Sequence, residues 1–200
     1  MYIEESTQEY PLSQIDVQRR FPDVSFPTIF TPPDGYALVN STPAPSFNAS
    51  RQSLRELPPQ KHDGLWVQQW CVDDLTQEQI SAILAAAKAS KNVQINQWRL
   101  KANNESFTFA GKHIATDDLS MRDILVTNGR IANRGTLPPE WLGGWKALNN
   151  SVVAIPSVAV WMDFIDAMYD QGNTNFKHAQ MLKTALAAAE TVDQVNAIVW

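Results

Sequence analysis

The spacing of hydrophobic and polar residues changes along the chain, and proline marks the first change. Nine of the twelve prolines lie in the first 60 residues, and none lies between Lys61 and Leu137. Proline fixes φ, lacks a backbone N–H and favours an extended conformation in the residue before it. We therefore expect residues 1–64 to form a mostly extended arm with short strands at most, for example at 36–40 or 24–27.

Local signals add a turn and one helix to this proline-rich arm. Pro32-Pro33-Asp34-Gly35 is typical of a turn. Ser13 precedes a short amphipathic stretch and has Asp16 three residues later, which is the pattern of an N-terminal capping box. The arm is thus expected to contain one short helix after Ser13.

From Leu65 onward, apolar residues recur at the spacings of strands and helices and predict regular elements. Residues 66–72 alternate loosely and indicate a strand. Thr76 with Gln79 predicts a capped helix start, and apolar residues at the helical period bury one face through about Ser90. Alternation over 98–102 and 106–109, with turns at 103–105 and 110–112, then predicts a β-meander that leads to His113.

The last third of the chain is predicted to be mainly helical. A helix is expected over 119–134, capped by Asp117 or Asp118 and stopped by Gly135. Residues 144–148 and 151–155 indicate two strands joined at Asn149-Asn150. An apolar stripe that includes Trp161 predicts a helix ended by Gly172, followed by helices over 174–189 and after Thr191. The predicted class is α+β, with an extended N-terminal arm (1–64) and a globular domain (65–200) of small antiparallel hairpins packed with about five helices.

Composition narrows the classes of partner. No apolar run approaches the ~20 residues that span a bilayer, and the acidic start, Met1-Tyr-Ile-Glu-Glu, does not resemble a secretory signal. A net charge of -5 without any basic run argues against nucleic acid. The single cysteine, Cys71, has apolar neighbours and is expected to fill core space. We expect neither a membrane nor a nucleic-acid partner.

Candidate chemistry is sparse. The sequence has no glycine-rich phosphate loop and no Gly-x-Ser-x-Gly motif. His62-Asp63 and His113 with Asp117-Asp118 come closest to a metal group, but neither has a recognised ligand spacing. Asp73-Asp74 and Asp117-Asp118 precede helix starts, where carboxylates accept free backbone N–H groups. We therefore expect helix caps, and no catalytic residue, metal or cofactor.

Aromatic residues are the candidates for recognition. The arm contains seven of them, although a proline-rich extended segment builds little core alone. Such an arm is expected to lie on its own globular part or on another subunit, so that the protein forms a homo-oligomer or part of a larger assembly. Trp141 follows Pro-Pro-Glu in a predicted loop and is expected to be exposed, whereas Trp161 is expected in the core. The candidate docking residues are Tyr10, Phe21, Phe26, Phe30, Tyr36 and Trp141.

A set of scattered positions in the second half carries a resemblance. In order, they are Gly111, Asp117 or Asp118, Trp145-Lys146, Asn149-Asn150, Val152-Val153, Phe176, Leu182-Lys183, Ala188-Ala189-Glu190-Thr191, Ile198 and Trp200. This outline resembles a small domain of unassigned function near the C-termini of tail-fibre-associated proteins of tailed bacteriophages. Residues 66–78 also resemble a junction in tail-fibre-region proteins.

The resemblance implies a non-enzymatic structural component of a phage tail, located in the virion. The protein would be part of the fibre, of the baseplate or of an adaptor that joins them, and its partners would be other tail proteins, namely fibre or baseplate subunits. An assembly chaperone that is absent from the mature particle is the alternative. A cell-wall or polysaccharide hydrolase is a third possibility, which the lack of a histidine and carboxylate constellation disfavours.

Overall fold

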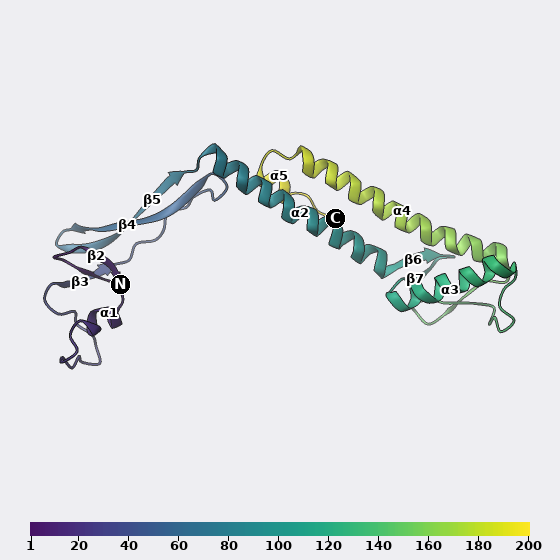
Figure 1. Cartoon of the computed structure of the whole chain (residues 1–200), viewed down its shortest axis with the longest axis horizontal. Coiled ribbons are helices and arrows are strands. Elements are labelled where there is room, and N and C mark those ends of the chain that lie inside the picture. Colours follow the sequence, from purple (N-terminus) through teal and green to yellow (C-terminus); the bar gives the residue numbers. More distant parts are fainter. The chain divides into compact units, whose positions relative to one another are not determined.

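A computed structural model describes residues 1–200, which divide into two compact units, Met1–Ser81 and Ala82–Trp200 (Figure 1). The structure contains helices and mainly antiparallel strands, and this confirms the predicted α+β class. None of the helices has an apolar stretch long enough to cross a membrane.

The first unit is built on a five-stranded sheet. The strand order is β2-β1-β3-β5-β4, and only the β3–β5 pair is parallel. A short helix, α1, follows β2, and Ser13 caps it with Asp16 as predicted. The bounds are β1 (Tyr2–Glu4), β2 (Glu9–Leu12), α1 (Gln14–Arg19), β3 (Tyr36–Asn40), β4 (Gln52–His62) and β5 (Leu65–Asp74).

A long hairpin shows that the predicted arm boundary was wrong. Strand β4 pairs with β5 from Gln52↔Asp74 to His62↔Leu65, so a cut after residue 64 would divide one ribbon. The two prolines inside β4 are tolerated because β4 is an edge strand, and the register shifts between Leu57 and Gln60. Strand β3 and the turn at Gly35 are confirmed, but residues 24–27 form no strand.

The helix α2 (Gln77–Glu105) begins at the predicted Thr76 capping box but runs much further than predicted. The strand prediction for 98–102 was wrong. Trp98 packs in a hydrophobic core and Leu100 is exposed, because residues two apart share one face of a strand but not one face of a helix. No proline or glycine interrupts α2, so nothing local ends it before residue 105.

Two small hairpins and one helix follow α2, and their predicted positions are confirmed. Asp117 caps α3 by accepting from Leu119 N and Ser120 N, and Gly135 ends it in the left-handed conformation. The second hairpin is shorter than predicted, because Ala147 N donates to Ser151 O and Asn150 takes the left-handed conformation in a longer turn. The bounds are β6 (Ser106–Phe109), β7 (Lys112–Ala115), α3 (Asp118–Arg134), β8 (Gly144–Lys146) and β9 (Val152–Ala154).

One continuous helix, α4 (Val158–Ala188), replaces the two helices predicted around Gly172. A single glycine costs about 1 kcal/mol in a helix interior, which the packing of α4 on both sides outweighs. Within the second unit α4 lies beside α2 (Figure 1), and the side-chain amide of Asn175 donates to Asn103 Oδ1 at 2.9 Å. The last helix, α5 (Val192–Asn196), begins at the predicted Thr191–Gln194 capping box.

Two hydrophobic cores lie along α4. The first joins the two hairpins and α3 to the start of α4, around the fully buried Trp161 and Phe164. The second joins α2, the end of α4 and α5 around Ile95 and Ala179. Every residue of both cores belongs to the second unit, whereas the first unit buries only five apolar side chains, Ile3, Leu12, Val17, Val39 and Pro59.

Candidate functional site

Four of the six predicted docking residues gather in the first unit, where they pack on one another. The Phe21 ring lies 5.7 Å from Tyr36 and 6.4 Å from Phe26, and Phe26 lies 5.3 Å from Phe30. The Phe30 ring also contacts Tyr2 at 5.2 Å. We call these five residues the aromatic cluster. The rings are half-buried, so the arm packs against itself while the outer parts of the rings stay accessible.

Charged side chains fix one side of the aromatic cluster. The Arg20 guanidinium lies 5.8 Å from the centre of the Tyr36 ring and pairs with Glu4 and Glu9. The hydrogen bonds from Thr7 and Tyr36, with the charge of Arg20, lower the pKa of the Glu4 carboxyl. These contacts hold α1 against β1 and β3 at the cluster.

The fifth predicted docking residue, Tyr10, lies in β2 and bonds to the Glu56 carboxylate of β4. Burial, together with the bond to this carboxylate, raises the pKa of Tyr10 to about 12. Tyr10 is therefore already bonded within its own unit, and its ring is half-buried.

Trp141 was wrongly predicted to be an exposed loop residue. It is half-buried, its indole N–H donates to Ile155 O at 2.9 Å, and its ring packs at 5.7 Å from Trp161. A tryptophan in a loop is stabilised when its indole N–H donates to a backbone carbonyl and its ring packs against a hydrophobic core. Trp141 belongs to the second unit and is not part of the aromatic cluster.

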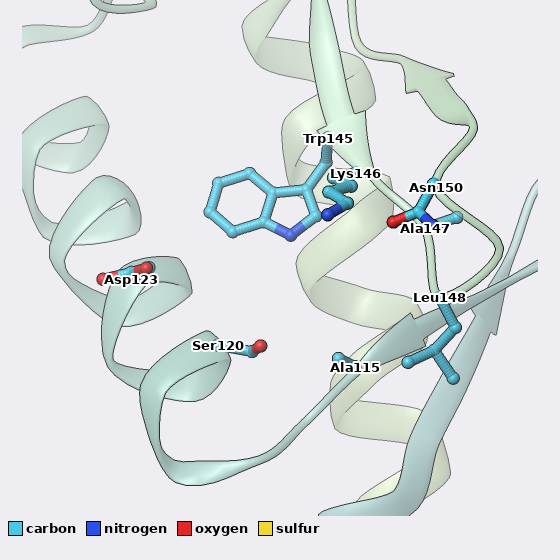
Figure 2. Close-up of a pocket in the computed structure, with 8 residues that line it drawn as sticks. All are labelled: Ala115, Ser120, Asp123, Trp145, Lys146, Ala147, Leu148 and Asn150. Carbon is cyan, nitrogen blue, oxygen red and sulfur yellow. The ribbon is translucent and has the colours of Figure 1, made fainter.

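The second unit contains an open cavity of about 320 Å³ between α3 and the second hairpin. Figure 2 shows the indole of Trp145 between the α3 side chains on one side and the β8–β9 turn on the other. Half of the lining side chains are apolar and half are polar. The lining residues are Ala115, Ser120, Asp123, Trp145, Lys146, Ala147, Leu148 and Asn150.

Several contacts hold the walls of this cavity. Leu148 N donates to His113 O at 2.9 Å, and Lys112 Nζ donates to Val152 O at 2.9 Å, so the two hairpins are joined. The Trp145 ring is wedged 5.5 Å from Trp161 and 5.8 Å from Phe164. The cavity is therefore built on packed elements and not on a free loop.

The start of α3 forms the remaining wall. Asp117 accepts from two backbone N–H groups and from Ser120 Oγ, and these bonds lower the pKa of the Asp117 carboxyl, the backbone bond from Ser120 most of all. The predicted capping role of this carboxylate is confirmed. Asp123 lies on the next turn of α3 and is one of the residues that line the cavity (Figure 2).

Other predicted positions have roles within the fold. Asp73 and Asp74 do not cap α2. Asp73 pairs with Arg55 across the β4–β5 ribbon and Asp74 accepts from Gln52, while Thr76 is the cap.

Cys71 is only half-buried and donates a hydrogen bond to Asp73, so the prediction that it fills core space was wrong. The bond to this carboxylate raises the pKa of the Cys71 thiol. No three His, Cys, Asp or Glu side chains form a group that could hold a metal ion.

A family model described as a domain of unknown function (DUF4376) matches residues 86–199, which is more than half of the chain. The chain belongs to the DUF4376 family. The DUF4376 match covers the buried residues of both hydrophobic cores and the whole cavity, whereas the aromatic cluster lies before it. Comparison with curated proteins found no match, and comparison with solved structures found none.

Sequence reasoning missed the cavity as a site. Trp145, Lys146 and Asn150 stood out only as strand and turn positions, and Ser120 and Asp123 did not stand out at all. The distance of more than 20 residues between the two walls hides their proximity. The available signal is the mixed character of Trp145-Lys146 beside an asparagine turn, which places aromatic, charged and amide groups on one short hairpin.

Proposed function

We propose that this protein is a non-enzymatic structural component of a phage tail, within the fibre, the baseplate or an adaptor between them. The sequence resemblance over residues 107–200 supplies the biological setting. The aromatic cluster is the observation that supports a docking role, because it offers half-buried rings in a unit with only five buried apolar side chains. Exposed apolar surface of this kind is typical of protein interfaces.

Aliphatic side chains beside the aromatic cluster extend the apolar surface. Ile29 is 85% exposed and Val24 is 51% exposed, and both lie in the segment that carries Phe26 and Phe30. A tail subunit that covered this segment would remove large apolar groups from water, at roughly 25 cal/mol per Å². This supports docking of the first unit on another protein of the assembly.

The sheet edges favour side-chain docking over strand addition. Both edge strands contain proline, Pro11 in β2 and Pro58-Pro59 in β4. Proline has no N–H for a ladder with an added strand and protects sheet edges from such pairing. The proposed contact is therefore made by the aromatic cluster and its aliphatic neighbours.

Mass spectrometry of purified particles of the encoding phage tests the structural role. We expect the protein to be present at stoichiometric amounts relative to other tail proteins. If it is found in infected cells and in tail-fibre intermediates but not in particles, the assembly chaperone replaces this proposal.

A pair of surface variants tests the docking face. Ile29→Asp places a charge beside the aromatic cluster, and Leu142→Asp places one on a residue that is 95% exposed in the other unit. We expect both variants to fold and only Ile29→Asp to lower incorporation into particles. Equal incorporation of the two variants would remove the aromatic cluster as the docking face.

Enzyme assays address the remaining alternative. We expect the protein not to hydrolyse peptidoglycan or polysaccharide, and alanine variants of the polar candidates to behave as the parent does. Hydrolysis by the parent that disappears in one correctly folded variant would establish an enzyme instead. The variants are His62→Ala, His113→Ala, Asp117→Ala, Asp118→Ala and His178→Ala.

A further inference from the structure

The cavity in the second unit has unused hydrogen-bonding groups. The Trp145 indole N–H, the Asp123 carboxylate, the Lys146 ammonium and the Asn150 side-chain amide make no hydrogen bond or ion pair with the protein. By contrast, the indoles of Trp141 and Trp161 both donate to protein oxygens. Four residues that line one cavity therefore carry polar groups whose donors and acceptors have no protein partner.

The chemistry of the lining selects the class of ligand. Asp123 accepts hydrogen bonds, Lys146 donates them, and Asn150 does both. Trp145, Ala147 and Leu148 add apolar surface. A sugar ring has the complementary composition, because its hydroxyls donate and accept while its C–H groups carry slight positive charge and favour an aromatic face. A volume of about 320 Å³ also lies within the range of roughly 300–1,000 Å³ that small-molecule sites occupy.

We infer that this cavity binds a neutral saccharide, as a terminal residue or branch of a glycan. The charges of Asp123 and Lys146 cancel, so the site carries no net charge to attract an ion of either sign. An anion would meet the Asp123 carboxylate, and the N-terminal amides of α3 that could hold it are already bonded to Asp117. A cation would meet the Lys146 ammonium.

The walls are arranged before any ligand arrives. Trp145 is fixed by three aromatic neighbours, Trp141, Trp161 and Phe164, and the turn that carries Asn150 is tied to β7 through Leu148 N and His113 O. A site on packed elements loses little conformational entropy on binding. This inference rests on the cavity alone and is independent of the proposed place in a phage tail.

The test uses the full chain labelled with ¹⁵N and follows the indole N–H signals. The Trp145 signal is assigned from its loss in Trp145→Phe, and the probes are methyl glycosides of glucose, galactose, mannose and N-acetylglucosamine at millimolar concentrations. We expect at least one glycoside to shift the Trp145 signal in a saturable way. If none of them does, or if sodium phosphate or acetate produces the same shift, the saccharide site is refuted.

Substitutions at exposed positions distinguish the cavity from other surfaces. We expect Asp123→Ala and Lys146→Ala each to weaken binding by about tenfold, the effect of losing one hydrogen bond to a charged group. The control is Asp163→Ala, which removes an exposed carboxylate of α4 outside the cavity and is expected to leave the affinity unchanged. If Asp123→Ala and Lys146→Ala bind the saccharide as tightly as the parent does, the inference is overturned, and the affinity of Trp145→Phe does not change that conclusion.

Discussion

The indole N–H of Trp161 donates a hydrogen bond to the side-chain oxygen of Asn128, 3.0 Å away. Trp161 lies on α4 and is fully buried, while Asn128 lies on α3. The bond satisfies the one polar group that this ring brings into the core, and it sets the contact between the two helices.

Replacing Trp161 is expected to destabilise the second unit strongly. Truncation of a buried tryptophan costs about 3–5 kcal/mol, so we expect Trp161→Ala to lower the free energy of unfolding by this amount in urea titrations. Asn128→Ala leaves the indole N–H unbonded and costs about 1–3 kcal/mol. The exposed Leu142→Ala is the control, with a change below about 0.5 kcal/mol. A fall in Tm of less than about 2 °C for Trp161→Ala would contradict its core position.

Two glycines are expected to respond in opposite ways to alanine. A Cβ at Gly144 would lie 2.1 Å from Val153 O, the backbone of the partner strand, so Gly144→Ala is expected to force the hairpin apart and to cost about 1–3 kcal/mol. A Cβ at Gly129, inside α3, meets open space, and Gly129→Ala is expected to stabilise by about 0.5–1 kcal/mol. Thermal unfolding of both variants checks the pair, and a neutral Gly144→Ala would show that the two strands can separate freely.

The contribution of the Asp117 cap is expected to depend on pH. Bonds from Ser120 and Leu119 lower the folded-state pKa of Asp117 below 3.8, so this carboxylate stabilises the fold above that value and loses its effect as the pH falls through the folded-state pKa. We expect Asp117→Ala to be less stable than the parent at neutral pH. The difference is expected to shrink in acid, as measured by urea unfolding at a series of pH values. A difference that grows in acid would contradict the capping role.

The second unit is expected to fold alone. Both hydrophobic cores use residues from 84 onward, so a fragment of residues 76–200 retains them together with the capping Thr76 of α2. We expect cooperative thermal unfolding of this fragment by circular dichroism. A fragment of residues 100–200 lacks Ile95 and Trp98 and serves as the control, with a broad or absent transition. A non-cooperative transition in the longer fragment would mean that its fold needs the first unit.

Helix starts were predictable from the sequence because their chemistry is local. At Ser13, Thr76, Asp117 and Thr191 the cap and its bonding partner lie within three residues of each other. The tight turn at Gly111 is set by backbone conformation and was equally accessible. Such features depend on few residues, so their pattern survives without knowledge of the fold.

Helix lengths and the cavity were not predictable because they depend on tertiary packing. Gly172 lies inside α4, where contacts of the flanking turns with two cores outweigh its low propensity. In α2, Trp98 and Ala102 share the inner face, and this spacing fits a strand as well as a helix. The cavity forms only when α3 meets the second hairpin, so no single stretch of sequence encodes it.

The hydrogen bond between Asn175 and Asn103 forms in only one alignment of α2 and α4. Sliding either helix by one turn, ~5.4 Å, would separate the amides, and Asn175, which is 7% exposed, would lose its bond to Asn103 in a place that water barely reaches. The apolar contacts on either side tolerate such slippage better, because dispersion has little directional preference. Asn103 and Asn175 thus fix how α2 and α4 are aligned between the tryptophan-rich core and the Ile95 core.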